Sequence, residues 1–500
     1  MPWAAAARRH WARPWAPVAL AVGLAWLLRL PFLQRIAYPD EGGLLLVAGA
    51  WHAGGPELYG RLFVDRPPLL LLFFRLGHEL GGLLAVRVLG LAVIALLVAA
   101  AGRVGWLMAG RRGATWAALV AAGLTSNPVL GALEVNGELI GASLVLGSGA
   151  LALDAVRRED GRRSRLLLLA AGLLASSAPL VKQNLVDGLV FVGVLVLATA
   201  WRDRWGLPRT AREVGALGAG AVLPVVATCV WALAWGPGLG VLWETLVQFR
   251  LSAAEVIASS SSSSTQRRLV QLPMVALVSG LLPVLVVALW FARRRRDDPV
   301  LVATVALLLT EVAGALMGGN YWTHYLIALV PAAALLTGLA ARAGSHPRVM
   351  GVTVAAVVAS AVVGGVVALT PPVTRVSADE TAVADWLRQA SRPGDSGAVT
   401  YGRANILESA GLRPGYRQLW SLPVRTLDPR LRELSRSVRS PRGPVWLIEG
   451  TPLDTWGLDP GGRVQRAVER HYREVATVCD IAVYLKRGAT RDLPPVPDCS

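Results

Sequence analysis

The sequence predicts a polytopic α-helical membrane protein of about eleven transmembrane helices, followed by a small extracytoplasmic α/β domain at the C-terminus. The membrane part is predicted by composition, because 54% of the 500 residues are apolar and only 17% are charged. It is predicted again by long apolar runs that continue to about residue 369. After residue 369 the charge density rises, so we expect a membrane domain over residues 1–369 and a soluble domain over 370–500.

The predicted spans are the runs that approach the ~20 residues a helix needs to cross a hydrocarbon core of about 30 Å. They are residues 15–33, 84–109, 113–133, 139–156, 166–181, 185–201, 214–236, 270–292, 300–317, 325–341 and 349–369. The runs at 166–181 and 325–341 are short enough to be re-entrant. The first run resembles the core of a signal peptide, but no small-x-small cleavage site follows it, so we expect a retained helix.

Arginines fall in alternate loops between these runs, and short cytoplasmic loops are enriched in Lys and Arg. The arginine-rich segments are 8–13, 111–112, 157–165, 202–212, 293–296 and 342–348, whereas the other loops carry acidic residues and fewer basic ones. The pattern predicts a cytoplasmic N-terminus and an extracytoplasmic C-terminal domain. The net charge of +17 is then mainly a topology signal, and we expect membrane lipids but no nucleic acid as partners.

The C-terminal segment alternates helix-like and strand-like stretches, which is typical of a small α/β layer domain. The helix-like stretches are 379–391, 428–438 and 463–471, and the strand-like ones are "GAVTYG", "PVWLIEG" and "DIAVYLKR". Cys479 and Cys499 both lie here, whereas Cys229 lies in a predicted span. Because an exported compartment permits oxidation, a Cys479–Cys499 disulfide is one hypothesis, and two free thiols are the other.

The sequence contains no Walker loop, dinucleotide fingerprint, zinc spacing or nucleophile elbow. The Ser-rich run at 259–265 is predicted to be a flexible spacer. Only two lysines occur beside abundant Ala, Arg and Gly, which is typical of a GC-rich bacterial genome and predicts a plasma-membrane location.

The remaining chemistry lies near the outer membrane surface, mainly in the stretch 34–83. Asp40 and Glu41 follow the first span, and Asp65 and Arg66 precede a Pro-Pro pair. The residues from this pair to Gly82 are too few for a comfortable span. We therefore expect a structured outer loop rather than a simple hairpin between two spans.

Several motifs resemble the GT-C superfamily of membrane glycosyltransferases. The outer loop contains "YPDEGG", "GAWHAGG", "LYGRLFVDRPPLL" and "AVRVLG", and the similarity continues through "LVKQNLVDGLVF" and "NYWTHYLIALVPAAALL". In this order and on one membrane side, they are similar to the branch of the protein O-mannosyltransferases and the lipid A aminoarabinose transferase. The resemblance covers roughly residues 15–345.

The resemblance implies transfer of a sugar from a polyprenyl phosphate to an acceptor on the outer face, which is a glycan, a lipid or a protein. It places the catalytic acid at Asp40, with Glu41 beside it. A sugar hydroxyl is a poor nucleophile, and a carboxylate in hydrogen-bond reach can take its proton during attack. The leaving phosphate needs no general acid, but it needs fixed cations as negative charge develops.

Arg66, Lys182 and His324 are the candidates for binding that phosphate. Lys182 follows an apolar run, where an ionisable side chain indicates function or a lysine that snorkels to the headgroups. Arg66 has Asp65 as a potential partner, although side chains of neighbouring residues tend to point apart. His324 lies in "YWTHY", where an interfacial aromatic belt is equally expected.

Glu138 is the second acidic position that the resemblance implies, near the donor or a metal. This chain has Glu where Asp is usual, and an acid at a helix N-terminus also has a purely structural explanation. The sequence leaves open whether a divalent cation takes part. The further candidates are Arg87 as a family-like basic position, His52 and Glu57 for acceptor binding, and Tyr38 and Trp51 for sugar stacking or interfacial anchoring.

Two other functions compete with this interpretation. A transporter or flippase of a lipid-linked or small polar substrate tends to show matched halves and charges at the midplane, whereas the polar groups here gather on one side. A sensor or assembly protein would leave Asp40 and Glu41 unexplained. The soluble domain is expected to help select the acceptor, and it shows no catalytic pattern of its own.

Overall fold

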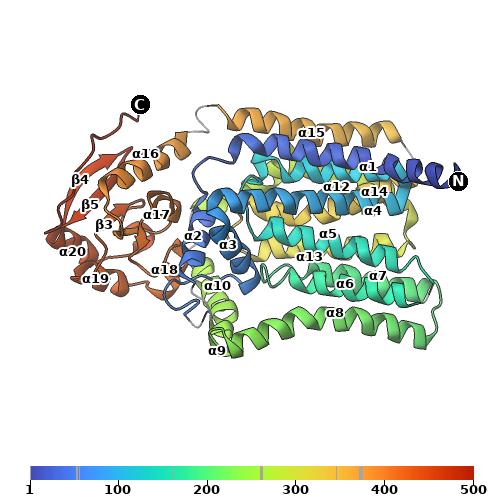
Figure 1. Cartoon of the computed structure of the whole chain (residues 1–500), viewed down its shortest axis with the longest axis horizontal. Helices are drawn as coiled ribbons and strands as arrows, with labels where there is room; N and C mark the ends of the chain where they lie inside the picture. The colour runs from blue at the N-terminus through green and yellow to red at the C-terminus, as the bar shows by residue number, and fades with distance from the viewer. Residues whose placement is uncertain are drawn as a thin grey trace.

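The computed structural model describes residues 2–51, 55, 57–159, 161–259, 263–344, 346–370 and 375–499. The molecule is elongated, with a bundle of long helices at one end and the C-terminal α/β part at the other (Figure 1). The bundle contains α1 (Pro2–Arg29), α4 (Leu83–Thr125), α5 (Gly137–Ala155), α6 (Arg162–Ser177), α7 (Asp187–Arg202), α8 (Leu207–Ala234), α11 (Ser263–Val278), α12 (Leu281–Ala292), α13 (Pro299–Met317), α14 (Val330–Ala343) and α15 (Pro347–Ala368).

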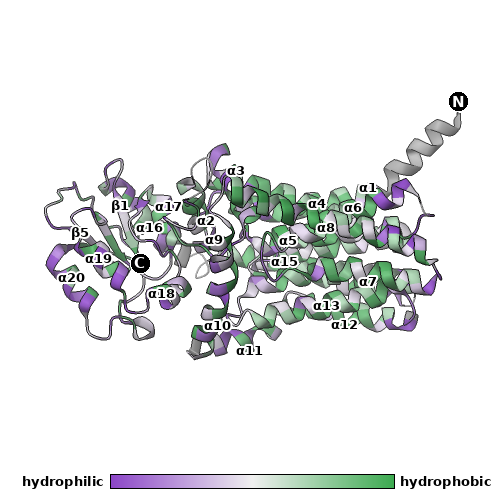
Figure 2. Ribbon diagram, turned by 90° about the horizontal axis from the view of Figure 1, so that it is seen from below, coloured by the Kyte–Doolittle hydropathy of each residue, from purple (hydrophilic) through white to green (hydrophobic). Residues whose placement is uncertain are grey.

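Hydrophobic residues cover this bundle, and hydrophilic residues gather in the C-terminal part and at the far loops (Figure 2). Among the described residues, 7 helices are long and apolar enough to cross a membrane, or 8 if the bent pair α11–α12 forms one span. The chain is thus a multi-span membrane protein. The helices α6 and α7 have only 16 residues each, so the total of about eleven spans stays a prediction.

Helix α4 contains two of the predicted spans because the chain turns back within it. Ala109 and Gly110 have non-helical backbone angles, and a Cβ on Gly105 would lie 2.1 Å from the carbonyl oxygen of Gly113. Residues eight apart in a straight helix lie about 12 Å apart, so these two glycines face each other across a tight reversal. The second arm ends at Thr125, earlier than the predicted end at residue 133.

Between α1 and α4, the outer loop folds into two short helices, α2 (Pro39–Ala50) and α3 (Pro68–Gly81). They pack on α4 and on the C-terminal part through a shared core that includes Leu45, Phe74 and Leu419. The structured outer loop expected from the sequence is therefore present. Two further short helices, α9 (Leu239–Trp243) and α10 (Phe249–Ser259), lie at the same end of the bundle (Figure 1), and α10 packs beside α18 (Ser421–Leu427) of the C-terminal part.

The C-terminal part has a five-stranded sheet with the order β2-β1-β3-β5-β4. Its strands are β1 (Ser396–Val399), β2 (Arg413–Pro414), β3 (Trp446–Glu449), β4 (Tyr472–Val478) and β5 (Ile481–Lys486). Parallel pairs join β1 to β2 and β3, whereas β5 pairs antiparallel with β3 and β4. Its helices are α16 (Arg375–Ala390), α17 (Ala404–Ala410), α18 (Ser421–Leu427), α19 (Arg432–Arg439) and α20 (Arg463–His471).

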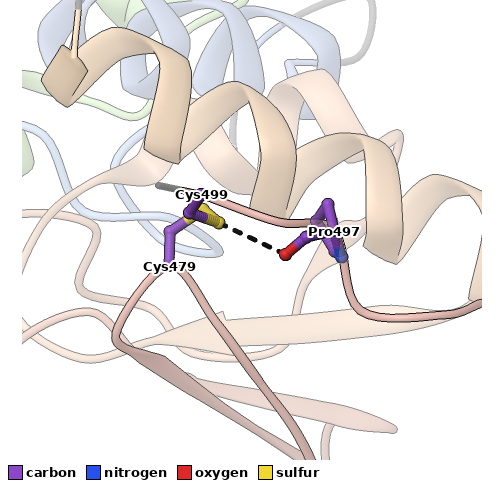
Figure 3. The surroundings of a disulfide bond; sticks show 3 residues. All are labelled: Cys479, Pro497 and Cys499. Atoms are coloured by element: carbon purple, nitrogen blue, oxygen red, sulfur yellow. Dashed lines mark hydrogen bonds between the residues drawn. A yellow bond between two sulfur atoms is a disulfide. The ribbon is translucent and has the colours of Figure 1, made fainter.

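The predicted strand-like stretches correspond to β1, β3 and β5, and the predicted helix-like stretches to α16, α19 and α20. The division at residues 369 and 370 stays a prediction, because residues 371–374 lie outside the described residues, as do residues 260–262 of the Ser-rich run. A disulfide joins Cys479 to Cys499, with Cα atoms 5.4 Å apart (Figure 3). It ties the end of the chain to the turn between β4 and β5.

Candidate functional site

Helix α2 directs its two adjacent acids to different surroundings. It begins at Pro39, and the backbone N–H of Tyr38 donates to Glu41 Oε2 over 3.1 Å, which completes a capping arrangement at the helix start. Neighbouring residues lie about 100° apart around a helix. Consequently Glu41 enters the core while Asp40 faces a cavity.

Glu41 is fully buried and forms an ion pair with Arg87 at 2.8 Å. It also accepts a hydrogen bond from the backbone N–H of Val135 at 2.9 Å. Arg87 donates in addition to four backbone carbonyls at the end of the first helix, those of Phe32, Leu33, Arg35 and Ile36. The Glu41–Arg87 pair therefore anchors the outer loop to α4, and neither side chain lines the cavities described below.

Asp40 lines a cavity of about 450 Å³ between the outer loop, the bundle and the C-terminal part, here called the outer cavity. The indole N–H of Trp420 donates to Asp40 Oδ1 over 2.8 Å. The C-terminal part contributes one wall, which contains Tyr401, Gly402, Trp420, Ser421, Leu422, Pro423, Arg425 and Trp456. Asp40 of the outer loop is thus in contact with a distant segment of the chain, the C-terminal part.

A second cavity of about 650 Å³ lies beside the first, and we call it the membrane-side cavity. Its charged lining is basic, with Arg66, Lys182 and Arg250. Its apolar lining comes from α10, α11 and α13 and includes Ala253, Ala254, Ile257, Leu269, Leu316 and Met317. The two cavities adjoin because Arg66, Arg250, Thr265 and Tyr325 line both.

Lys182 and Glu138 form a buried ion pair in the membrane-side region. The ammonium also lies 4.4 Å from the ring centroid of Tyr325, a cation–π contact. The pairing holds the lysine inside the protein rather than extended to the headgroups. Burial lowers the pKa of Lys182, and the Glu138 carboxylate opposes this effect.

His324 links this pair to another buried acid, Glu134. Its Nε2 lies 3.7 Å from Glu138 Oε1, and its Nδ1 lies 3.8 Å from Glu134 Oε2. Burial raises the pKa of Glu134 well above its usual range, and repulsion from Asp40, Glu41 and Glu138 adds to the shift. The structure therefore brings Glu138, Lys182 and His324 into one network.

Arg66 pairs with its neighbour Asp65 at 2.7 Å, so the argument that adjacent side chains point apart is wrong at this position. The second oxygen of Asp65 pairs with Arg250 at 2.8 Å. Burial alone would raise the pKa of Asp65. The two guanidinium groups outweigh this effect and hold that pKa below its usual range. Asp65 fixes both arginines where the two cavities meet.

Sequence reasoning missed Glu134, Arg250 and Trp420 as members of the site. Glu134 stands four residues before Glu138 in "EVNGE", a spacing that indicated a second acid near the same position. Arg250 carried a weaker signal as a basic residue between Glu244 and Glu255 in an outer segment. No local pattern marks Trp420, because only the docking of the C-terminal part brings it to Asp40.

The other candidates that the structure describes do not line the two cavities. Glu57 is exposed, and His52 lies outside the described residues. Trp51 packs edge-on against Trp231, with ring centroids 5.9 Å apart. Across the residues that the structure describes, no group of three or more His, Cys, Asp or Glu side chains is placed to hold a metal ion.

Neither a protein-family model nor a curated protein sequence matches the chain, but its structure resembles solved membrane proteins. ArnT from Cupriavidus metallidurans bound to undecaprenyl phosphate superposes with a TM-score of 0.62 at 15% identity, over 93% of this chain and 97% of that one. The chain has the GT-C fold. The apo state of the same ArnT gives a TM-score of 0.61 at 15% identity, over 96% and 98% of the two chains.

A more distant GT-C structure matches as well. AglB, the oligosaccharyltransferase from Archaeoglobus fulgidus, in complex with an inhibitory peptide and a dolichol-phosphate, has a TM-score of 0.52 at 11% identity. The match covers 96% of this chain and 75% of that chain. At these identities the likeness concerns the fold alone, and the chemistry has to be argued from the site.

Proposed function

We propose that this GT-C chain transfers a sugar from a polyprenyl phosphate carrier to an acceptor hydroxyl at the outer face of a bacterial plasma membrane. The observation that carries the proposal is the junction of two unlike cavities. The membrane-side cavity offers aliphatic walls and three basic side chains, which suit an isoprenoid phosphate. The outer cavity offers the carboxylate of Asp40.

In the proposed reaction the acceptor oxygen attacks the anomeric carbon of the donor sugar. The bond from this carbon to the carrier phosphate oxygen breaks, and polyprenyl phosphate leaves with an added negative charge. Asp40 takes the acceptor proton as general base. Arg66, Arg250 and Lys182 stabilise the leaving phosphate, since preorganised cations act most strongly in a site shielded from water.

We assign supporting roles to the remaining predicted residues. Glu138 holds Lys182 and lies 3.7 Å from His324 Nε2, and Asp65 holds the two arginines. Glu41 already accepts three hydrogen bonds, so we assign it to anchoring and not to proton transfer. The C-terminal wall of the outer cavity is proposed to contact the acceptor, whether glycan, lipid or protein.

The test follows radiolabelled sugar from polyprenyl phosphate donors to membrane acceptors, with the purified protein in detergent or liposomes. Wild type is expected to transfer label, and Asp40→Asn is expected to lose transfer by about 10²–10⁴-fold. Glu79→Gln is a matched control, because Glu79 is an exposed acid that pairs with Arg75 on α3. Full transfer by Asp40→Asn would remove its role as base.

The competing transport hypothesis predicts a different result in the same assay. A flippase would move the labelled lipid between leaflets without consuming it. If wild type consumed none of the donors but accelerated their movement across liposomes, sugar transfer would be the wrong function.

A further inference from the structure

Trp420 reaches Asp40 from a segment 380 residues later in the chain, and its indole N–H donates to Asp40 Oδ1 over 2.8 Å. Trp420 is half-buried and precedes α18 with an extended backbone. Within the described residues, this is the one hydrogen bond that restrains the Asp40 side chain. A charged acceptor makes it one of the stronger kinds of hydrogen bond.

Gly43 makes room for this contact. Residues three apart share one face of a helix, so Asp40 and Gly43 lie one above the other on α2. A Cβ on Gly43 would lie 2.4 Å from Cζ2 of Trp420, which is closer than real contacts allow. The indole can lie against this face only because residue 43 has no side chain.

The segment before Trp420 is held in place by the outer loop. The backbone N–H of Phe63 donates to the carbonyl of Arg417 over 3.0 Å, and the Arg417 guanidinium donates to the carbonyl of Tyr59 over 2.9 Å. Gly42 faces the backbone of Asn405 at the start of α17, where an added Cβ would lie only 2.5 Å from its Cα. The docking thus fixes the position of the indole relative to α2.

We propose that Trp420 is a positioning residue for Asp40, so that docking of the C-terminal part completes the catalytic site. The indole N–H holds one carboxylate oxygen and leaves the other directed at the acceptor hydroxyl. This inference rests on the proposed function, since it assigns the geometry of the same base. It also explains why two glycines follow the acids in "DEGG".

The test measures kcat and donor KM for Trp420→Phe, which keeps an aromatic ring but removes the N–H. We expect kcat to fall about 10- to 100-fold, as small displacements of a catalytic group can cause, while donor KM stays unchanged. Trp386→Phe is the matched control, because its indole N–H donates to Pro494 in the C-terminal part away from the cavities. It is expected to keep the wild-type kcat.

Gly43→Ala supplies an independent variant that leaves both partners intact. Its methyl group is expected to displace the indole and to lower kcat about as much as Trp420→Phe. Phenylalanine lacks the Cζ2 atom, so the double variant is expected to be no worse than either single variant, a strong coupling. Losses that multiply in the double variant would overturn the positioning role.

The outcomes separate this inference from the proposed function. Activity lost in Asp40→Asn but retained in Trp420→Phe would overturn the positioning role and leave sugar transfer standing. Absence of transfer by wild type with every donor would overturn the proposed function and the inference with it.

Discussion

The two cavities of the site differ in charge and in the segments that enclose them. The charged lining of the membrane-side cavity is basic and its aliphatic walls come from α10, α11 and α13. The outer cavity has arginines too, but it adds the acids Asp40, Asp65 and Glu134 and several aromatic residues, and it is closed by the C-terminal part. Of the residues that the structure describes, Arg66, Arg250, Thr265 and Tyr325 line both. In the proposed reaction this separation keeps the cations on the leaving phosphate and the base on the acceptor.

The largest loss of stability is expected from Lys182→Met, in the membrane-side cavity. It leaves the buried Glu138 without its ion-pair partner, and breaking a buried pair costs about 3–5 kcal/mol of unfolding free energy. Thermal unfolding in detergent measures this loss, and donor KM is expected to rise as well. The double variant Lys182→Met/Glu138→Gln should regain stability but not donor affinity; recovery of both would show that Lys182 is purely structural.

A smaller effect is expected at the docking of the C-terminal wall, from Gly42→Ala. Its Cβ would meet the backbone of Asn405, and such overpacking typically costs about 1–3 kcal/mol. Hydrogen exchange should increase in α17, and transfer should fall. Gly23→Ala is the control, since a Cβ there meets nothing within 4 Å, and equal effects of the two substitutions would argue against tight docking.

Glu134, which lines the outer cavity, is expected to make the unfolding free energy of the protein depend on pH. Burial and repulsion from Asp40, Glu41 and Glu138 raise its pKa, so the folded state keeps a proton that the unfolded state releases above about pH 4.3. Stability contributed by this group is therefore complete below that pH and is lost as pH rises through the raised pKa.

The measurement is the melting temperature of wild type and Glu134→Gln between pH 5 and pH 8. His324, with Nδ1 3.8 Å from Glu134, is the neighbouring group that can also titrate, so His324→Gln is measured beside it. Glu134→Gln should flatten the decline with rising pH, whereas the exposed Glu57→Gln should keep it. An unchanged slope in Glu134→Gln would contradict a buried protonated acid.

The smallest effect is expected at the mouth of the outer cavity, from Arg268→Ala. The Arg268 guanidinium lies 4.0 Å from the ring centroid of Trp322, a contact worth about 0.5–1 kcal/mol at exposed sites. Acceptor KM should rise a few-fold, roughly as that energy implies, with donor KM unchanged. Arg293→Ala removes a similar pair with Trp290 outside both cavities, and the same rise there would make the effect unspecific.

The sequence predicted the membrane class, the structured outer loop and most of the C-terminal elements, because apolar run length and alternation report directly on helices and strands. It also placed Asp40, Arg66, Lys182 and His324 near one another through the order of their motifs. The strands β2 and β4 were missed, since Arg413–Pro414 is too short and β4 carries too many polar residues for a clear pattern.

The different surroundings of Asp40 and Glu41 could not be predicted. Two adjacent acids look equivalent in a sequence, and only the helical geometry of α2 sends Glu41 to Arg87 and Asp40 to the outer cavity. The pairing of Arg66 with Asp65 was considered but disfavoured, because neighbouring side chains were expected to point apart, whereas a loop does not alternate side chains as a strand does. Trp420 depends on tertiary docking and leaves no local signal.

The division of roles between the two cavities is tested most directly by measuring kcat and donor KM for Asp40→Asn and Arg250→Gln in one steady-state assay. We predict that Asp40→Asn lowers kcat by about 10²–10⁴-fold and leaves donor KM within about twofold of wild type. Arg250→Gln should raise donor KM and also lower kcat, because its guanidinium is proposed to bind the donor phosphate and to stabilise it as it leaves. A change in donor KM without loss of kcat in Asp40→Asn would contradict the account, because it would place Asp40 on the donor rather than on the acceptor proton.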